Sequence, residues 1–267
     1  GGKQARPDGG TTRVLQSTDG SVIGSVPEGN RKDIRNAVEA ARSAEAWSRQ
    51  SAHGRAQVLY YLAENLDAQR ARVVQVLGTT LGEAAAQAEV DQAIGHLFTA
   101  AAWADKHDGA VHQPPLHGVV LALNEPMGVI ALIAPDASPL AGLLALAAPA
   151  MAMGNRVVVV PSRRHPLVSA ELTVLADTSD LPGGVLNLVT GDADALGDTL
   201  AAHSEVMAFW APQATPAQAA RFEALSAATL KRTWVAFEAD GGPCHTDARE
   251  VLEQATQVKN VWVPYGT

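Results

Sequence analysis

Apolar runs and stretches with helical periodicity alternate through the second half of the chain. The short runs are almost continuously apolar, which is typical of strands that are buried on both faces. Longer amphipathic stretches separate them. This alternation predicts a doubly wound parallel sheet covered by helices on both sides, with right-handed crossovers. The expected strands are 156–160, 185–189, 205–210 and 231–237, and the expected helices are 139–153, 166–176, 193–202 and 216–227.

The first half of the chain is predicted to be mainly helical. Asn30 has the position of an N-cap, and Asp33 lies three residues later, as in a capping box. Apolar residues then recur at helical spacing from Ile34 to Ala44. Two further helices are expected at 54–77 and 84–106, each with one apolar side that would face the core.

Two β-rich segments frame the alternating region. The sequence from 118 to 134 predicts two strands, "GVVLAL" and "GVIALIA", joined by residues 124–127 as a hairpin. Near the other end, a helix at 247–254 precedes a final strand at 258–263.

Residues 137–155 carry no charge and are nearly long enough to span a membrane. Most of them are small, and Pro139 and Pro149 lie within the stretch. A buried helix therefore accounts for the segment better than a membrane span does.

Composition narrows the class of protein. The chain is 47% hydrophobic and 18% charged, as in ordinary globular proteins. Its net charge of −8 and the lack of a basic stripe argue against a nucleic-acid partner. Cys244 is the only cysteine, so no intramolecular disulfide can form. We therefore expect a reducing, cytoplasmic location.

Ligands of such a sheet bind at the carboxyl ends of its strands, so the loops there are the first place to expect chemistry. The sequence contains no G-x-G-x-x-G, no phosphate-loop lysine motif and no histidine pair with metal-ligand spacing, and we expect no metal site. Asp192 could bind a ribose but is better explained as a helix cap. Arg163 and Arg164 could meet a phosphate but are better explained as solvated charges. Cys244 has only an adjacent histidine beside it, so we do not expect it to be a nucleophile.

The order of motifs resembles that of an aldehyde dehydrogenase along nearly the whole chain. "GSVPEGNRKDIRNAVEAARSAEAWS", "RAQVLYYLAENL" and "AIGHLFTAAAWADKHDG" are similar to the family's N-terminal helices. "EPMGVIALIAP", "APAMAMGNRVVVVPS", "LPGGVLNLVTGD" and "FEADGG" follow in the family's order. The resemblance implies a Rossmann-like domain of the NAD type plus a small β oligomerisation domain.

The tail "AREVLEQATQVKNVWV" is similar to the extreme C-terminus of the family, where this strand belongs to the oligomerisation domain. Family members place a whole catalytic domain between the Glu-Leu-Gly-Gly motif and this tail, whereas here the two nearly adjoin. The chain therefore most resembles the degenerate C-terminal module of a family-16 aldehyde dehydrogenase, and its start at Gly1, without methionine, agrees with a preceding module. The expected domains are N-terminal helices at 1–110, an oligomerisation hairpin at 111–130, the Rossmann-like domain at 131–243 and an oligomerisation tail at 244–267.

The resemblance also implies that the family's functional positions are altered. Ala137 stands where an asparagine amide stabilises the oxyanion, and loss of one such donor costs about 10²–10³ in rate. Val160 and Arg163 replace the lysine and glutamate that bind the adenosine ribose, and the sequence 209–212 replaces the Phe-Thr-Gly-Ser near the pyrophosphate. Glu238 could match the general base only with the extra Asp240 intervening.

We therefore expect a non-catalytic module, or pseudoenzyme, with a structural role. No bound cofactor is expected in such a module. The alternative is a nucleotide-binding regulatory module that binds NAD or NADP. An enzyme that is active by itself is less favoured. The partners we expect are a second copy, giving a dimer, and a covalently linked active aldehyde dehydrogenase. Degenerate cofactor positions are Pro135, Ser162, Arg163 and Gly191. Interface residues are Val119, Val120, Leu121, Val258, Val261, Trp262 and Val263.

Overall fold

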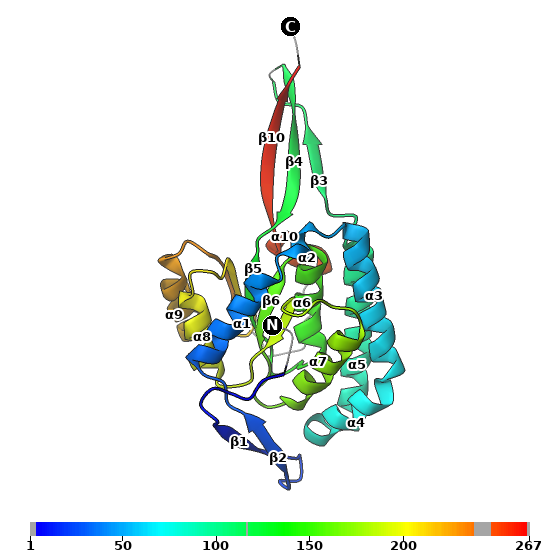
Figure 1. The fold of residues 1–267 in the computed structure, drawn as a ribbon, viewed down its shortest axis with the longest axis vertical. Coiled ribbons are helices and arrows are strands. Elements are labelled where there is room, and N and C mark those ends of the chain that lie inside the picture. Colours follow the sequence, from blue (N-terminus) through cyan, green and yellow to red (C-terminus); the bar gives the residue numbers. More distant parts are fainter. Residues whose placement is uncertain (1–3, 116, 238–246, 266–267) are drawn as a thin grey trace.

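A five-stranded parallel sheet forms the centre of the molecule in the computed structural model, which describes residues 4–115, 117–237 and 247–265 (Figure 1). The strand order is β7-β6-β5-β8-β9, so the chain winds outward in both directions from β5. The predicted α/β class with a Rossmann-like sheet and N-terminal helices is confirmed. The sheet strands are β5 Val129–Ile133, β6 Arg156–Val160, β7 Leu186–Leu188, β8 Ala208–Ala211 and β9 Arg232–Val235. The helices are α1 Arg31–Ser43, α2 Ala46–Arg49, α3 Ala52–Ala68, α4 Arg70–Leu81, α5 Glu83–Trp103, α6 Ala141–Ala152, α7 Leu167–Thr178, α8 Ala193–Ala202, α9 Pro216–Ala227 and α10 Ala248–Gln254.

Strand β6 shows why its apolar run is continuous. Successive side chains point to opposite faces of a strand. Val157 and Val159 pack into the core beneath α3 to α7, whereas Val158 and Val160 pack into the core with α1, α8 and α9. Both faces of the sheet are thus covered, as the sequence predicts.

The uncharged segment forms α6, whose twelve residues are all buried. It lies between the sheet and the long helices α3 and α5 and also contacts α10. The expectation of a buried helix is confirmed. In the part of the chain that the structure describes, no helix is both long and apolar enough to cross a membrane.

The expected helix starts are also confirmed. The side chain of Asn30 accepts hydrogen bonds from the amides of Lys32 and Asp33, and Asp33 bonds back to the Asn30 amide. Asp192 accepts from the amides of Asp194 and Ala195 at the start of α8. The single helix predicted at 54–77 is wrong, because the chain turns at Gln69 and forms α3 and α4.

A three-stranded antiparallel arm projects from the body (Figure 1). It consists of β3 (Gly109–His112), β4 (Gly118–Pro126) and β10 (Thr256–Pro264), with β4 in the centre. The predicted hairpin over 118–134 is wrong in its pairing. β4 pairs with β3 and β10, whereas β5 enters the parallel sheet from Val129, inside the range assigned to the hairpin. Only Met127 and Gly128 separate β4 from β5, so the pair joins two sheets rather than forming one.

The predicted interface residues meet within one chain. Val263 pairs with Val119, Trp262 with Val120 and Val261 with Leu121 in the β4–β10 register. Their contacts in this structure are therefore intramolecular. The outer edges of β3 and β10 remain unpaired among the described residues.

The sequence prediction missed a small hairpin that precedes α1. Strands β1 (Thr12–Gln16) and β2 (Val22–Pro27) pair antiparallel, with most positions exposed. Their composition lacks the apolar run of a buried strand, so no pattern indicated them. The hairpin matters because its side chains reach the carboxyl edge of the main sheet.

Candidate functional site

The candidate site lies at the carboxyl edge of the parallel sheet, where the loops after β5, β6, β7 and β8 meet. Ligands of doubly wound sheets bind at this edge. The loop that follows β9 continues into 238–246, outside the described residues. The predictions about Glu238 and Cys244 fall there and remain predictions.

An ion-pair network fixes the loop after β6. The Arg163 guanidinium pairs with the Asp192 carboxylate beside the end of β7, and it lies 3.6 Å from Glu28. Arg13 of β1 donates to Glu28 at 2.6 Å and to the backbone oxygen of Arg163 at 2.7 Å. Each partly exposed pair contributes little alone, but together they connect the N-terminal hairpin to two strand ends. This network, which we call the edge network, occupies the loop with the protein's own charges.

Ser162 connects the loops after β5 and β6. It is 2% exposed, and its hydroxyl donates to Asp136 at 2.5 Å and accepts from the His165 amide at 3.1 Å. Burial lowers the pKa of His165, and its Nδ1 lies 2.9 Å from the Thr80 hydroxyl. Arg164 is exposed, with its guanidinium 3.7 Å from Asp136. The structure thus brings Ser162 and Arg163 into one loop but directs both to partners within the protein.

Ala137 is exposed in the loop after β5 and presents only a methyl group. No side-chain donor exists at the position where the resemblance implies one. Pro135, another degenerate position, is buried directly after the strand. The side chain next to Ala137 that does form contacts is Ser138, which turns inward.

Glu89 is a buried carboxylate that the sequence analysis missed. It projects from α5, is 7% exposed, and accepts from the Ser138 hydroxyl at 2.7 Å. Its other oxygen accepts from the amides of Leu140 and Ala141, at 2.9 and 2.8 Å, at the start of α6. A carboxylate is stabilised at a helix N-terminus. The available signal was a lone acidic residue beside Val90 on the apolar side of a helix.

Gly191 packs against the protein rather than lining an open cradle. A Cβ there would lie 2.7 Å from Leu196 Cδ1 and 3.2 Å from the backbone oxygen of Gly29. The Gly29 amide also donates to the Thr190 oxygen at 2.7 Å. The close approach of these two backbone segments explains why a glycine is needed at position 191, and no bound ligand has to be invoked.

Side chains also bridge the start of α8 to α9. The Arg221 guanidinium pairs with Asp194 and Asp198, and Gln218 donates to Asp194 at 2.9 Å. The bonds from Gln218 and Arg221 lower the pKa of Asp194, so it stays ionised. The two helices are therefore joined at their solvent side by charge-assisted contacts.

Aromatic side chains fill the space beside the ends of β8 and β9. Trp210 is fully buried, and its ring lies edge-on to Trp234 at 5.5 Å. Trp234 in turn stacks on Phe237 at 3.8 Å. Among the described residues, the Trp210 ring N–H has no hydrogen-bond acceptor. This end of the edge is apolar and closely packed.

The fold and this edge define a Rossmann-like α/β domain with an attached β arm. A family-level comparison matches residues 5–236 to the Aldehyde dehydrogenase family. The chain belongs to that family, and the resemblance drawn from its motifs is confirmed at this level.

Individual relatives agree with the family assignment. Phenylacetaldehyde dehydrogenase of Pseudomonas fluorescens is 32% identical over 208 residues, which cover 73% of this chain and 41% of the relative. A crystal structure of a putative aldehyde dehydrogenase from Burkholderia cenocepacia superposes with a TM-score of 0.83 at 28% identity, covering 87% of this chain and 48% of that one. An NAD-dependent aldehyde dehydrogenase from Sinorhizobium meliloti superposes with a TM-score of 0.80 at 29% identity, covering 86% and 47%. The chain thus spans about half the length of the relatives it matches.

Proposed function

We propose that this chain is a non-catalytic aldehyde dehydrogenase module with a role in assembly, acting in the cytoplasm beside or linked to an active aldehyde dehydrogenase. The observation that carries the proposal is the edge network. Arg163 stands where the resemblance implies a ribose-binding glutamate, and it is held by Asp192 and Glu28. In a non-catalytic module this loop has to be stable, but it does not have to bind a cofactor.

The loops at this edge fit a nicotinamide dinucleotide poorly, and this supports the same proposal. Val160 is 0% exposed, so it offers a bound ribose neither a donor nor access. Gly191 is packed against Gly29, and Ala137 has no polar atom in its side chain. The relative from Sinorhizobium meliloti is described as NAD-dependent. In this chain the corresponding loops do not supply the donors that the family uses, so we propose no step through that cofactor.

Calorimetry tests the cofactor part of the proposal. We expect no saturable heat when NAD or NADP is titrated to millimolar concentration into this chain. Heat with NADP that is lost in Arg164→Gln but kept in Arg49→Gln would instead support a regulatory module in which an arginine binds the 2′-phosphate. Saturable binding of NAD would equally contradict the proposal.

An activity assay tests the catalytic part. We expect this chain alone to produce no NADH from aldehydes. If a longer natural protein oxidises aldehydes, Cys244→Ala should leave its turnover unchanged, because another module supplies the nucleophile. Loss of that turnover in Cys244→Ala would contradict the proposal that this module is non-catalytic.

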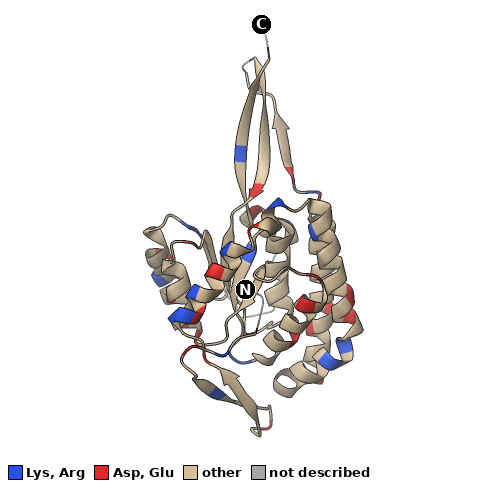
Figure 2. Cartoon of the chain, viewed as in Figure 1, with Lys and Arg blue, Asp and Glu red and all other residues tan. Residues whose placement is uncertain are grey.

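The arm supports the assembly role. Figure 2 shows it to be mostly uncharged, and Val258, Trp262 and Tyr265 are each more than half exposed. Both outer strand edges are open among the described residues, and open edges readily pair with another chain. We expect a dimer in sedimentation velocity at micromolar concentration. A monomer across that range would contradict the assembly role.

A further inference from the structure

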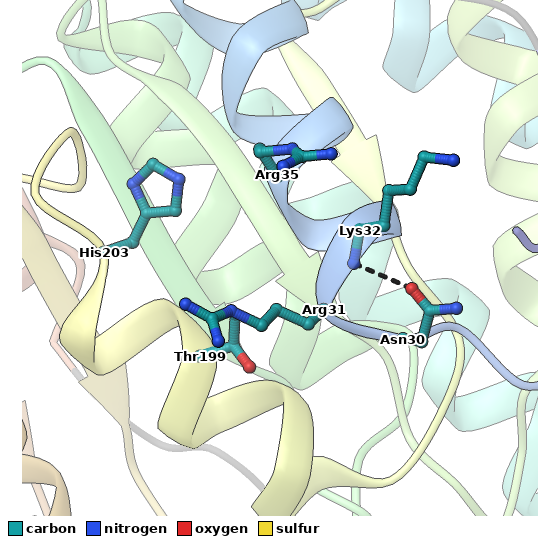
Figure 3. A pocket seen from close by; sticks show the side chains of 6 residues that line it. All are labelled: Asn30, Arg31, Lys32, Arg35, Thr199 and His203. Carbon is teal, nitrogen blue, oxygen red and sulfur yellow. Dashed lines mark hydrogen bonds between the residues drawn. The ribbon is translucent and has the colours of Figure 1, made fainter.

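A basic hollow lies between α1 and α8. Its cavity volume is about 540 Å³, within the range of small-molecule sites. None of the residues that line it belongs to the edge network. The lining residues are Asn30, Arg31, Lys32, Arg35, Thr199 and His203 (Figure 3).

Helical spacing places the groups of this hollow opposite one another. Arg31 and Arg35 are four residues apart and so share a face of α1. Thr199 and His203 have the same spacing at the end of α8. Figure 3 shows the Arg31 side chain reaching across toward Thr199, whereas Lys32 points away from it. Two guanidinium groups therefore border the space that α8 closes.

The charges of the hollow are only partly neutralised within the protein. Lys32 forms an ion pair with Asp8, and Asp33 is engaged by the capping box. Within residues 4–115, 117–237 and 247–265, neither Arg31 nor Arg35 forms an ion pair. Like charges four residues apart on a helix repel each other. In a chain of net charge −8, this local excess of positive charge favours an anionic occupant.

His203 adds a donor to the opposite wall. Its Nδ1 accepts the Glu205 amide at 3.2 Å, so the neutral ring carries its proton on Nε2. Burial and the neighbouring Lys231 lower its pKa, and the nearby pair of Arg42 and Glu205 is self-compensating. The Thr199 hydroxyl donates to the Ala195 oxygen at 3.0 Å and so serves as wall rather than donor.

We propose that this hollow binds a compact polyphosphate anion, such as a diphosphate or triphosphate group. Guanidinium groups match phosphate oxygens two at a time, and two of them suit an anion with several phosphates. The volume exceeds the needs of a single phosphate. None of the described lining residues is aromatic other than the histidine, so the hollow offers no broad stacking surface for a nucleobase.

Titration with inorganic pyrophosphate tests the proposal on the intact chain. Calorimetry at pH 7 and about 50 mM salt should give saturable 1:1 binding. Arg31→Gln/Arg35→Gln should weaken it at least tenfold, because both phosphate-binding forks are removed. Both residues are exposed, so the variant should keep the wild-type unfolding temperature. The control is Arg49→Gln/Arg72→Gln, which removes two arginine charges from ion pairs elsewhere on the protein and should bind within twofold of wild type.

Amide chemical shifts locate the bound anion. Pyrophosphate should move the amide signals of Thr199 and His203 in the wild type. Shifts confined to the loop around Arg163 would overturn the proposal. Absence of saturable heat in the wild type, or equal weakening in both double variants, would also overturn it.

Discussion

The buried carboxylate of Glu89 and the buried amine of Lys231 each hold a helix end. Glu89 accepts bonds at the start of α6, and the Lys231 Nζ donates to the backbone oxygen of His203 at 2.7 Å, at the end of α8. These signs match the helix dipole, positive at its start and negative at its end. Single residues far away in sequence thus complete helices that local capping leaves open.

Glu89→Gln should destabilise the fold. The amide keeps one acceptor oxygen but places a donor group toward the Ser138 hydroxyl or the α6 amides, so buried hydrogen bonds are lost. We expect about 2–4 kcal/mol less free energy of unfolding, measured by urea denaturation. Glu64→Gln is the control, because Glu64 is exposed on α3 and should change the value by less than about 0.5 kcal/mol. A similar small change in Glu89→Gln would show that the buried charge is dispensable.

Lys231 should make stability depend on pH above neutrality. Burial lowers the pKa of Lys231 from 10.5 to about 8. Between these values the unfolded lysine still binds a proton that the folded one has lost, so stability rises with pH. The full gain is at most about 3 kcal/mol.

Urea denaturation of wild type and Lys231→Met from pH 7 to pH 10.5 measures this effect. The wild type should gain stability relative to the variant across the window. Lys259→Met, which alters an exposed lysine paired with Glu125, should follow the wild type. Parallel stability curves for wild type and Lys231→Met would show that Lys231 is not the source of the pH dependence.

Contacts between residues close in sequence could be predicted, whereas contacts between residues distant in sequence could not. The caps Asn30 and Asp192 bond to amides within three residues, so their spacing sufficed. Glu89 bonds to residues about fifty positions away, and Arg163 to Asp192 across two strands. No window of sequence contains both partners of such a contact.

At the scale of elements, Gly184 sets how closely α1 approaches the loop before β7. Its φ is +95°, a conformation that residues with a Cβ rarely adopt, and a Cβ would lie 2.4 Å from the Ala40 oxygen. That oxygen belongs to α1, so the clash involves backbone. The glycine therefore fixes the docking of this helix.

Gly184→Ala should destabilise the protein, whereas Gly95→Ala should stabilise it. The first forces α1 away from its seat and should cost at least about 2 kcal/mol. Gly95 lies in α5, and a Cβ at that position would have no neighbouring atom within 4 Å, so alanine should gain about 0.5–1 kcal/mol. Thermal unfolding of both variants measures the difference. Equal effects would show that the close contact with Ala40 does not constrain the fold.

The pattern predicted elements better than it predicted their partners. The helices at 193–202 and 216–227 and the strand at 156–160 agree with the structure at both ends. The apolar strands β4 and β5 look alike in sequence, and only their neighbours decide that one joins the arm and the other the sheet. Periodicity reports which faces are buried, not which strand lies alongside.

At the scale of the whole molecule, the arm and the edge loops differ in what they leave exposed. The edge loops are held by internal ion pairs, and the arm leaves apolar side chains in solvent. The family and fold were predictable because ordered motifs extend over most of the chain. The pairing of Arg163 with acidic residues at this edge was not predictable, because residue types alone do not show which side chains will meet.

If the chain self-associates as proposed, removing apolar side chains from one face of β10 should weaken that association. Val258 and Trp262 are four residues apart on a strand, share a face and are each 61% exposed. Val258→Ser/Trp262→Ser should raise the dimer dissociation constant at least tenfold in sedimentation velocity, with little change in unfolding temperature. Val174→Ser, at an exposed site on α7, should leave the dimer intact. An unchanged dimer in the arm variant would place the interface elsewhere.

The complete enclosure of α6 has a consequence for the order in which the chain is synthesised. Its cover comes from α3, α5 and β5, which leave the ribosome before it, and from β6 and α10, which leave after it. Val251 and Leu252 of α10 are fully buried, and the Asn155 side chain behind α6 donates to the Ala255 oxygen at 2.8 Å. A nascent chain therefore carries an incompletely covered apolar helix until α10 emerges, and this interval is when chaperones would be needed most.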